Sequence, residues 1–255
     1  MNLDTIRFEK DGKLGRVWFN RPEVLNAVNN QATLDWNTAA EAIANDPDLR
    51  VVIISGTGDR SFSTGIDLKQ LAAGEIEQIY HHRWERALRI LETCDKIIIA
   101  AINGWCLGGG LQLALACDIR IARADAQLGL PAIKESLVPG MAVFRLPRFV
   151  GMGRAKRLTL SGDNVGAQAA LSIGLVDYVF ESDEFQMKVD ELAVHYLAAA
   201  SMGARQAKIL STQAFDHEHA TLIEKYFAAQ IVATDHPDHA EATRAYVEKR
   251  EPVWE

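Results

Sequence analysis

The stretch that decides the fold reads IIIAAINGWCLGGGL and covers residues 97–111. Its first six residues are apolar and mostly β-branched, which is typical of a buried strand. Three glycines follow and open an apolar segment, residues 111–117, that we predict to be helical. Glycine lets a ligand approach closely, and N–H groups at a helix start have no partner inside the helix, so this turn suits an oxyanion. A plain strand-to-helix turn, in which glycine only avoids a clash, would have the same pattern.

A second segment repeats this pattern. Residues 51–55, VVIIS, predict another buried strand, and glycine-bearing loops follow at residues 56–59 and 62–68. Two such loops after two buried strands could supply two backbone N–H donors to one carbonyl oxygen. The pair therefore favours an oxyanion site over a plain turn.

The two loops, with their spacing, resemble the crotonase superfamily of enoyl-CoA hydratases and isomerases. Further matching motifs follow in order over roughly residues 5–250: NRPE at 20–23, LNA at 25–27, ACDIRIA at 116–122, Gly162, AA at 169–170, GLV at 174–176 and YVEKR at 246–250. The resemblance implies an α/β fold, the crotonase-like ββα superhelix with mostly parallel sheets. It also implies a core over residues 1–195 and a C-terminal helical trimerisation region, residues 196–255, that packs on the core and on a neighbouring subunit.

The pattern of apolar residues independently predicts alternating strands and helices. Strands alternating with helices are typical of a mostly parallel sheet layered with helices. After Glu181 the pattern is helical only. The predicted elements before that point are a hairpin at 6–8 and 16–19, helices at 30–45 and about 76–93, and strands at 51–55, 97–102, 118–122 and 175–180.

Size and composition indicate an ordinary globular protein. The chain has 255 residues, 48% of them hydrophobic and 24% charged, and a net charge of −7. This charge argues against nucleic-acid binding, which normally needs a basic face. No apolar run approaches the roughly 20 residues that span a bilayer, and no secretory signal pattern begins the chain. Three cysteines form no disulfide framework, so we expect a cytoplasmic protein that binds no membrane.

The resemblance places two oxyanion donors on the backbone N–H groups of Ile66 and Gly109. Both loops are intact, so we expect the thioester carbonyl of a bound acyl-CoA to be polarised there. The substrate implied is a CoA thioester, and no permanently bound cofactor is expected.

The resemblance also places three acidic positions, and none of them is acidic here. Two are the glutamates that hydratases use, and these fall on Gln112 and Ala132; a third, acidic in some isomerases and in dehalogenases, falls on Gly140. Gln112 can orient a water but cannot take its proton, and Ala132 can do neither. The chain therefore departs from the family at the residues that define hydration.

Two other carboxylates are candidates for a displaced acid or base. Glu135 lies three residues after the second empty position, and the alternative is an exposed side chain paired with Lys134 or Arg145. Glu85 lies in the predicted helix, on the face where the dehalogenase branch keeps a histidine, and Trp84 before it matches an aromatic residue of that branch. The alternative for Glu85 is a position at the solvent margin of the helix.

Other reactive residues fit structural interpretations better. Cys106 beside the glycine turn is interpreted as a small buried cysteine, since no basic partner is near it in the sequence. A serine nucleophile at the helix start, which the distantly related caseinolytic proteases have, is missing, so we exclude a peptidase. We expect solvated histidines and no metal site at His81, His82, His217, His219, His236 and His239.

CoA contacts are implied by the resemblance alone. They fall on two loops of one subunit and on a C-terminal helix of its neighbour: Val24, Leu25, Ala27, Ser63 and Thr64, with Tyr246 and Lys249. Two function classes remain open. One is an acyl-CoA enzyme, such as an isomerase, hydrolase or lyase, that uses a displaced carboxylate. The other is a catalytically silent acyl-CoA-binding homologue; either is expected to form a homotrimer or homohexamer.

Overall fold

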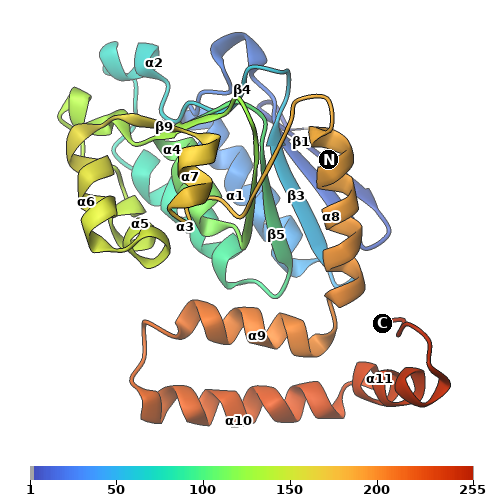
Figure 1. Ribbon diagram of the computed structural model, residues 1–255. Helices are drawn as coiled ribbons and strands as arrows, with labels where there is room; N and C mark the ends of the chain where they lie inside the picture. The colour runs from blue at the N-terminus through green and yellow to red at the C-terminus, as the bar shows by residue number, and fades with distance from the viewer. Residues whose placement is uncertain (1–2, 255) are drawn as a thin grey trace.

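The computed structural model describes residues 3–254, and its centre is a six-stranded sheet (Figure 1). The strand order is β1-β2-β3-β5-β7-β10. Strands β1 and β2 form the predicted antiparallel hairpin, and every other neighbouring pair is parallel. The strands are β1 (Ile6–Asp11), β2 (Leu14–Phe19), β3 (Val51–Gly56), β5 (Ile97–Ile102), β7 (Ile119–Arg123) and β10 (Tyr178–Phe180). The α/β class and the mostly parallel sheet are confirmed.

A second, four-stranded sheet carries the glycine loops. Its order is β4-β6-β8-β9, with only the last pair antiparallel. Three of its strands follow closely after β3, β5 and β7, so this sheet lies beyond the carboxyl ends of the central strands. The sequence did not predict it, because strands of three residues are too short to show alternation. They are β4 (Ser61–Ser63), β6 (Trp105–Leu107), β8 (Gln127–Gly129) and β9 (Asn164–Gly166).

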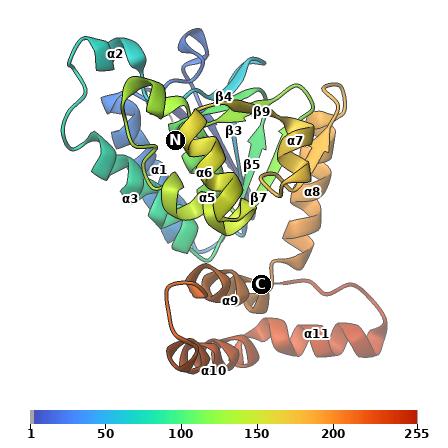
Figure 2. The same ribbon diagram turned by 60° about the vertical axis from the view of Figure 1, so that its left-hand side comes forward.

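Helices cover both faces of the central sheet, and alternation along its strands explains the two layers. On β3, Val52 and Ile54 join the apolar cluster under α1, α3 and α4, whereas Val51 and Ile53 face α8. Figure 2 shows α8 on the face opposite α1 and α3. The helices of this part are α1 (Asn30–Asn45), α2 (Leu68–Ala72), α3 (Tyr80–Thr93), α4 (Gly109–Ala116), α5 (Ala142–Val150), α6 (Met152–Ser161), α7 (Ala167–Ser172) and α8 (Phe185–Ala199), with 3-10 turns η1 (Pro22–Val24) and η2 (Pro131–Glu135).

Two predicted elements begin three or four residues later than predicted. The helix predicted from about residue 76 begins at Tyr80, because the Asn30 side chain bonds the backbone of Glu75 and Glu77 and holds that segment out of the helix. The strand predicted from residue 175 begins only at Tyr178, because the Leu175 N–H bonds back to a carbonyl of α7. The predicted helix at 30–45 is confirmed.

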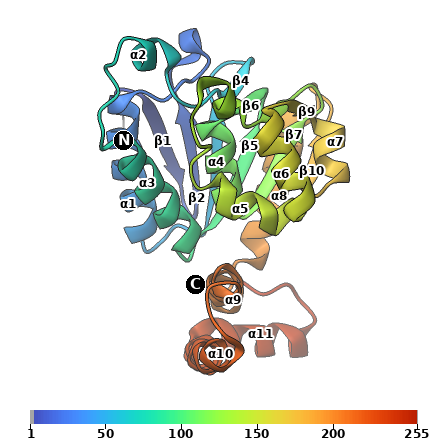
Figure 3. The same cartoon turned by 90° about the vertical axis from the view of Figure 1, so that its left-hand side faces the viewer.

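Three C-terminal helices lie below the core and are joined to it through α8 (Figures 1 and 3). They are α9 (Met202–Gln213), α10 (His219–Asp235) and α11 (Pro237–Glu248). Lys208 of α9 anchors them, since its Nζ lies 2.8 Å from Asp118 and donates to the Leu91 carbonyl at 3.0 Å. The division predicted between residues 195 and 196 falls inside α8, and the chain leaves the sheet at Ala200. Within residues 3–254 no helix is long and apolar enough to cross a membrane.

Candidate active site

The two glycine loops are in direct backbone contact. Gly65 has a φ of +80°, and a Cβ added to it would lie 2.5 Å from the Gly109 nitrogen. A Cβ added to Gly110 would lie 2.2 Å from the Ser63 carbonyl oxygen. Both distances are shorter than real Cβ contacts, so only glycine allows the loops to meet. The structure therefore brings together the two loops that the sequence singled out.

The two predicted donor groups, on Ile66 and Gly109, are unpaired. Ile66 forms a parallel bridge with Val28, in which Val28 bonds the Gly65 carbonyl and the Asp67 N–H, so the Ile66 N–H faces away from Val28. Gly109 is the first residue of α4, and its N–H has no partner within the helix. Across residues 3–254 neither N–H donates to a protein acceptor. Two free donors thus lie on abutting loops at the positive end of a helix.

Trp84 of α3 lies directly behind the Gly109 turn. A Cβ added to Gly109 would lie 3.5 Å from the indole Nε1. The side chain is buried and packs edge-to-face against Trp36 and tilted against Phe19. This aromatic packing fixes α3 against the turn and keeps the Gly109 position rigid.

Two of the three empty acidic positions face each other. Gln112 lies on α4, nearly one helical turn after Gly109. A Cβ added to Gly140 would lie 2.3 Å from the Gln112 Oε1, so the Gln112 side chain fills the space that a side chain at 140 would need. Among the described residues no group bonds the Gln112 amide, which leaves it available to a ligand or water.

The other empty position lies on η2 with Glu135. Ala132 and Glu135 are three residues apart in a 3-10 helix, whose side chains repeat every three residues, so both lie on one face. Glu135 is exposed and has no ion pair within residues 3–254. The exposure that the alternative predicted for Glu135 is confirmed, but its pairing with Lys134 or Arg145 is wrong, and Arg145 binds Glu85 and Glu92 instead.

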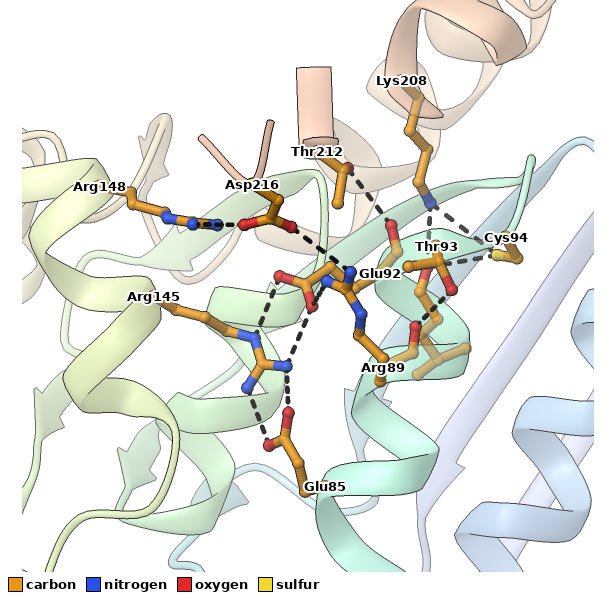
Figure 4. Close-up of polar contacts among 11 residues, drawn as sticks. Glu85, Arg89, Glu92, Thr93, Cys94, Arg145, Arg148, Lys208, Thr212 and Asp216 are labelled. Atoms are coloured by element: carbon orange, nitrogen blue, oxygen red, sulfur yellow. Dashed lines mark hydrogen bonds and ion pairs between the residues drawn. The ribbon is translucent and has the colours of Figure 1, made fainter. Parts of the chain in front are cut away.

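Glu85 is held in a bidentate ion pair (Figure 4). The Arg145 guanidinium donates to its two oxygens at 3.0 and 2.6 Å, and to Glu92 at 3.2 and 3.0 Å. Burial alone would raise the pKa of Glu92, but hydrogen bonds from Arg145 and Arg89 outweigh it and hold that pKa below its ordinary value. We did not predict this cluster from the sequence. The spacing of Glu85 and Glu92, seven residues apart and so on one helix face, was the signal for it.

The chain is similar to known proteins along almost its whole length. A family model described as Enoyl-CoA hydratase/isomerase matches residues 9–255. The chain belongs to this family of the crotonase superfamily. It is 35% identical to crotonyl-CoA hydratase of Syntrophomonas wolfei over 98% of this chain and 97% of that one. It is 34% identical to short-chain-enoyl-CoA hydratase of Clostridium acetobutylicum, with the same coverage. The crystal structure of enoyl-CoA hydratase from Bacillus anthracis superposes with a TM-score of 0.92 at 29% identity, covering 98% and 99% of the chains.

Within this enoyl-CoA hydratase/isomerase fold, the segments expected to contact CoA divide into two groups. Residues 24–27 lie against Ser63 and Thr64: the Thr64 N–H donates to the Leu25 carbonyl at 3.2 Å, and the Ser63 hydroxyl donates to the Asn26 carbonyl at 2.7 Å. Tyr246 and Lys249 lie at the end of α11, on the far side of the core from β4 (Figure 1). Within a single chain, only the first group therefore lies next to the glycine loops, and Tyr246 and Lys249 lie apart from them.

The remaining reactive residues are a cysteine and several histidines. Cys106 is fully buried, and burial raises the pKa of its thiol, which keeps it protonated and confirms its interpretation as a small core residue. Five of the six histidines that the sequence analysis expected to be solvated are exposed: His81, His82, His217, His219 and His239. His236 departs from the expectation, because it is partly buried and its Nδ1 accepts from the Asp238 N–H at the start of α11. In the part of the chain that the structure describes, no three His, Cys, Asp or Glu side chains are grouped to hold a metal ion.

Proposed function

We propose that the protein binds an acyl-CoA with its thioester carbonyl oxygen between the N–H groups of Ile66 and Gly109. The contact between the two glycine loops, with both amides unpaired, carries this proposal. Such donors stabilise the negative charge of an enolate or tetrahedral oxyanion, and the N-terminus of α4 adds a favourable dipole. The hydratase names of the relatives support the substrate class.

We also propose which residues contact the CoA part of the ligand. The backbone around Val24, Leu25 and Ala27, and around Ser63 and Thr64, would bind the pantetheine and adenine parts. Ser63 itself is fully buried and its hydroxyl donates to the Asn26 carbonyl, so Ser63 would hold this segment in place rather than touch the ligand. Tyr246 and Lys249 would close the pocket from a neighbouring subunit, where the Lys249 ammonium suits a phosphate.

The proposed chemistry is that of a lyase or isomerase with an atypical acid and base and no resident cofactor. Gln112, Ala132 and Gly140 cannot transfer a proton. Glu135 is the stronger candidate for a displaced base, because it is exposed, unpaired and on the face of Ala132. Glu85 would first have to leave Arg145, so a positioning role suits it better.

A specific observation supports the second candidate function, a silent acyl-CoA-binding protein. Gln112 faces Gly140 with no carboxylate at either position, so two of the family's proton-transfer positions are occupied by neutral groups. Both candidate functions include acyl-CoA binding, but only the enzyme would convert the bound acyl-CoA.

Calorimetric titration with butyryl-CoA and crotonyl-CoA tests the shared proposal, with free CoA as the control. Thioesters should bind more tightly than free CoA, because only they place a carbonyl between the two amides. Absence of thioester binding by the intact assembly would overturn the proposal. Consumption of crotonyl-CoA in the same samples then separates the enzyme from the silent homologue.

We further propose a homotrimer or homohexamer. Large apolar side chains of α10 and α11 are exposed in the single chain, among them Tyr226, Phe227, Ile231 and Val247. Exposed apolar surface of this kind marks interaction sites. Light scattering at micromolar concentration should give the mass of three or six chains, and a monomeric mass would contradict the proposal.

A further inference from the structure

One face of α4 leads from the candidate site to a separate cavity. Gln112 shares its helix face with Leu115 and Ala116, three and four residues later. These two residues line a cavity of about 470 Å³ whose other walls include Phe149 and Ala207. At 1.5 Å per residue, Leu115 lies about 9 Å along the helix axis from Gly109. The cavity is therefore within reach of an acyl chain that starts at the glycine turn.

Arg145 lines this cavity and is bonded to α3, the helix that packs behind the candidate site. Arg145 and Glu92 line the cavity, whereas Glu85 directly follows Trp84, which packs behind Gly109. The guanidinium donates to Glu92 on one side and to Glu85 on the other (Figure 4). Arg145 thus joins α5 to α3 at the wall of the cavity, and its partner Glu85 is adjacent to Trp84, which packs behind Gly109.

This ion-pair cluster resists displacement. The Arg145 side chain is only 2% exposed, and that of Glu92 is 12% exposed. Separating a buried charge from its partners leaves it uncompensated, which is strongly unfavourable. A neutral methylene chain offers the guanidinium no replacement hydrogen bond, so it cannot displace the cluster.

We propose that Arg145, held by Glu85 and Glu92, closes the inner end of the acyl-binding site and restricts the substrate to short acyl groups. The inference rests on the proposed function, because it takes the carbonyl position between Ile66 and Gly109 as its origin. The cavity beyond Arg145 is the space that a longer acyl chain would enter if the cluster were removed.

Titration of the intact protein with butyryl-, octanoyl- and dodecanoyl-CoA tests the proposal. The wild type should gain no affinity from butyryl to dodecanoyl. Arg145→Met should raise the dodecanoyl affinity relative to butyryl by about tenfold or more, since burying two further methylene groups has an effect of that size. Arg145→Met with Glu92→Gln is the second variant, because it leaves no buried charge unpaired beside the cavity.

Arg148→Met is the matched control. Arg148 lies on the same helix and lines the same cavity, but it pairs with Asp216 and not with Glu85 or Glu92. Its chain-length ratio should equal that of the wild type. A wild-type affinity that rises steadily with chain length overturns the inference, as does an unchanged ratio in the folded Arg145 variants. Absence of butyryl-CoA binding would instead contradict the proposed function.

Discussion

The candidate site has a backbone part and a side-chain part, and they differ in how tightly the fold determines them. The backbone part is the contact of residues 63–66 with residues 108–110, where a methyl group added at Gly65 or Gly110 would lie 2.5 Å or less from backbone atoms. The side-chain part is Gln112, Ala132 and Gly140, none of them fully buried. Substitution is costly in the first part and cheaper at Gln112 and Ala132 in the second, whereas Gly140 has a φ of +49° and lies against the Gln112 side chain. The proposed carbonyl polarisation would therefore depend on the backbone of the fold, whereas proton transfer would depend on a few replaceable side chains.

The largest expected effect concerns the side-chain part. Hydration of crotonyl-CoA by the wild type should be slow, because each missing acid or base group contributes roughly 10²–10⁴-fold. Gln112→Glu with Ala132→Glu should raise the rate by about 10²-fold or more, since glutamate has the shape of Gln112. The measurement is steady-state consumption of crotonyl-CoA.

The matched control is Ala132→Gln alone, with Gln112 unchanged. It adds the same volume at position 132 without a carboxylate and should bring no gain in the hydration rate. Glu135→Gln should remove any activity that the wild type has if Glu135 is the displaced base. Wild-type turnover equal to that of an ordinary hydratase, unchanged by Glu135→Gln and Glu85→Gln, would show that the catalytic groups lie elsewhere.

The next largest effect concerns the backbone part. Gly65→Ala would drive a methyl group against the Gly109 nitrogen and move one donor. Loss of one such donor typically lowers turnover by about 10²–10³-fold. Gly151→Ala is the control, because its φ of +77° is close to the +80° of Gly65 while nothing lies within 4 Å of an added Cβ. Equal loss of acyl-CoA turnover or binding in the two variants would indicate a general folding effect.

A smaller effect separates loop packing from chemistry. Gly110→Ala should lower the free energy of unfolding by about 1–3 kcal/mol, as overpacking does, since its methyl group meets the Ser63 carbonyl. Gly153→Ala, in open space on α6, should instead stabilise by about 0.5–1 kcal/mol. Urea unfolding of both variants provides the comparison, and a neutral Gly110→Ala would mean that the loops are not in close contact.

The smallest effect concerns acid stability. The pKa of Glu92 lies below its ordinary value, so its stabilising contribution is present above that ordinary value and is lost as the pH falls through the folded-state pKa. Glu92→Gln should therefore reduce proton uptake on unfolding in this acid range by up to about one proton. Glu224→Gln, an exposed carboxylate on α10, is the comparison variant. Unfolding free energies measured from neutral to acid pH should differ in slope only for Glu92→Gln.

The same contrast explains what could be predicted from the sequence. Long apolar strands such as residues 97–102, and the glycine turn after them, have strong local patterns, so the central sheet and the two glycine loops that follow its strands could be predicted. The three-residue strands and the cluster at Arg145 could not, because their residues are distant in the sequence and only the folded chain brings them together. The late start of α3 depends likewise on Asn30, which no pattern within residues 76–79 reveals.

The most direct test of the central claim is the infrared difference spectrum of bound butyryl-CoA, isotope-labelled at the thioester carbonyl carbon. Two N–H donors at Ile66 and Gly109 would polarise the carbonyl, so its stretching band should move to lower frequency on binding. The shift should shrink in Gly65→Ala and persist in Gly151→Ala. A tightly bound thioester whose carbonyl band stays at its position in water would contradict the account.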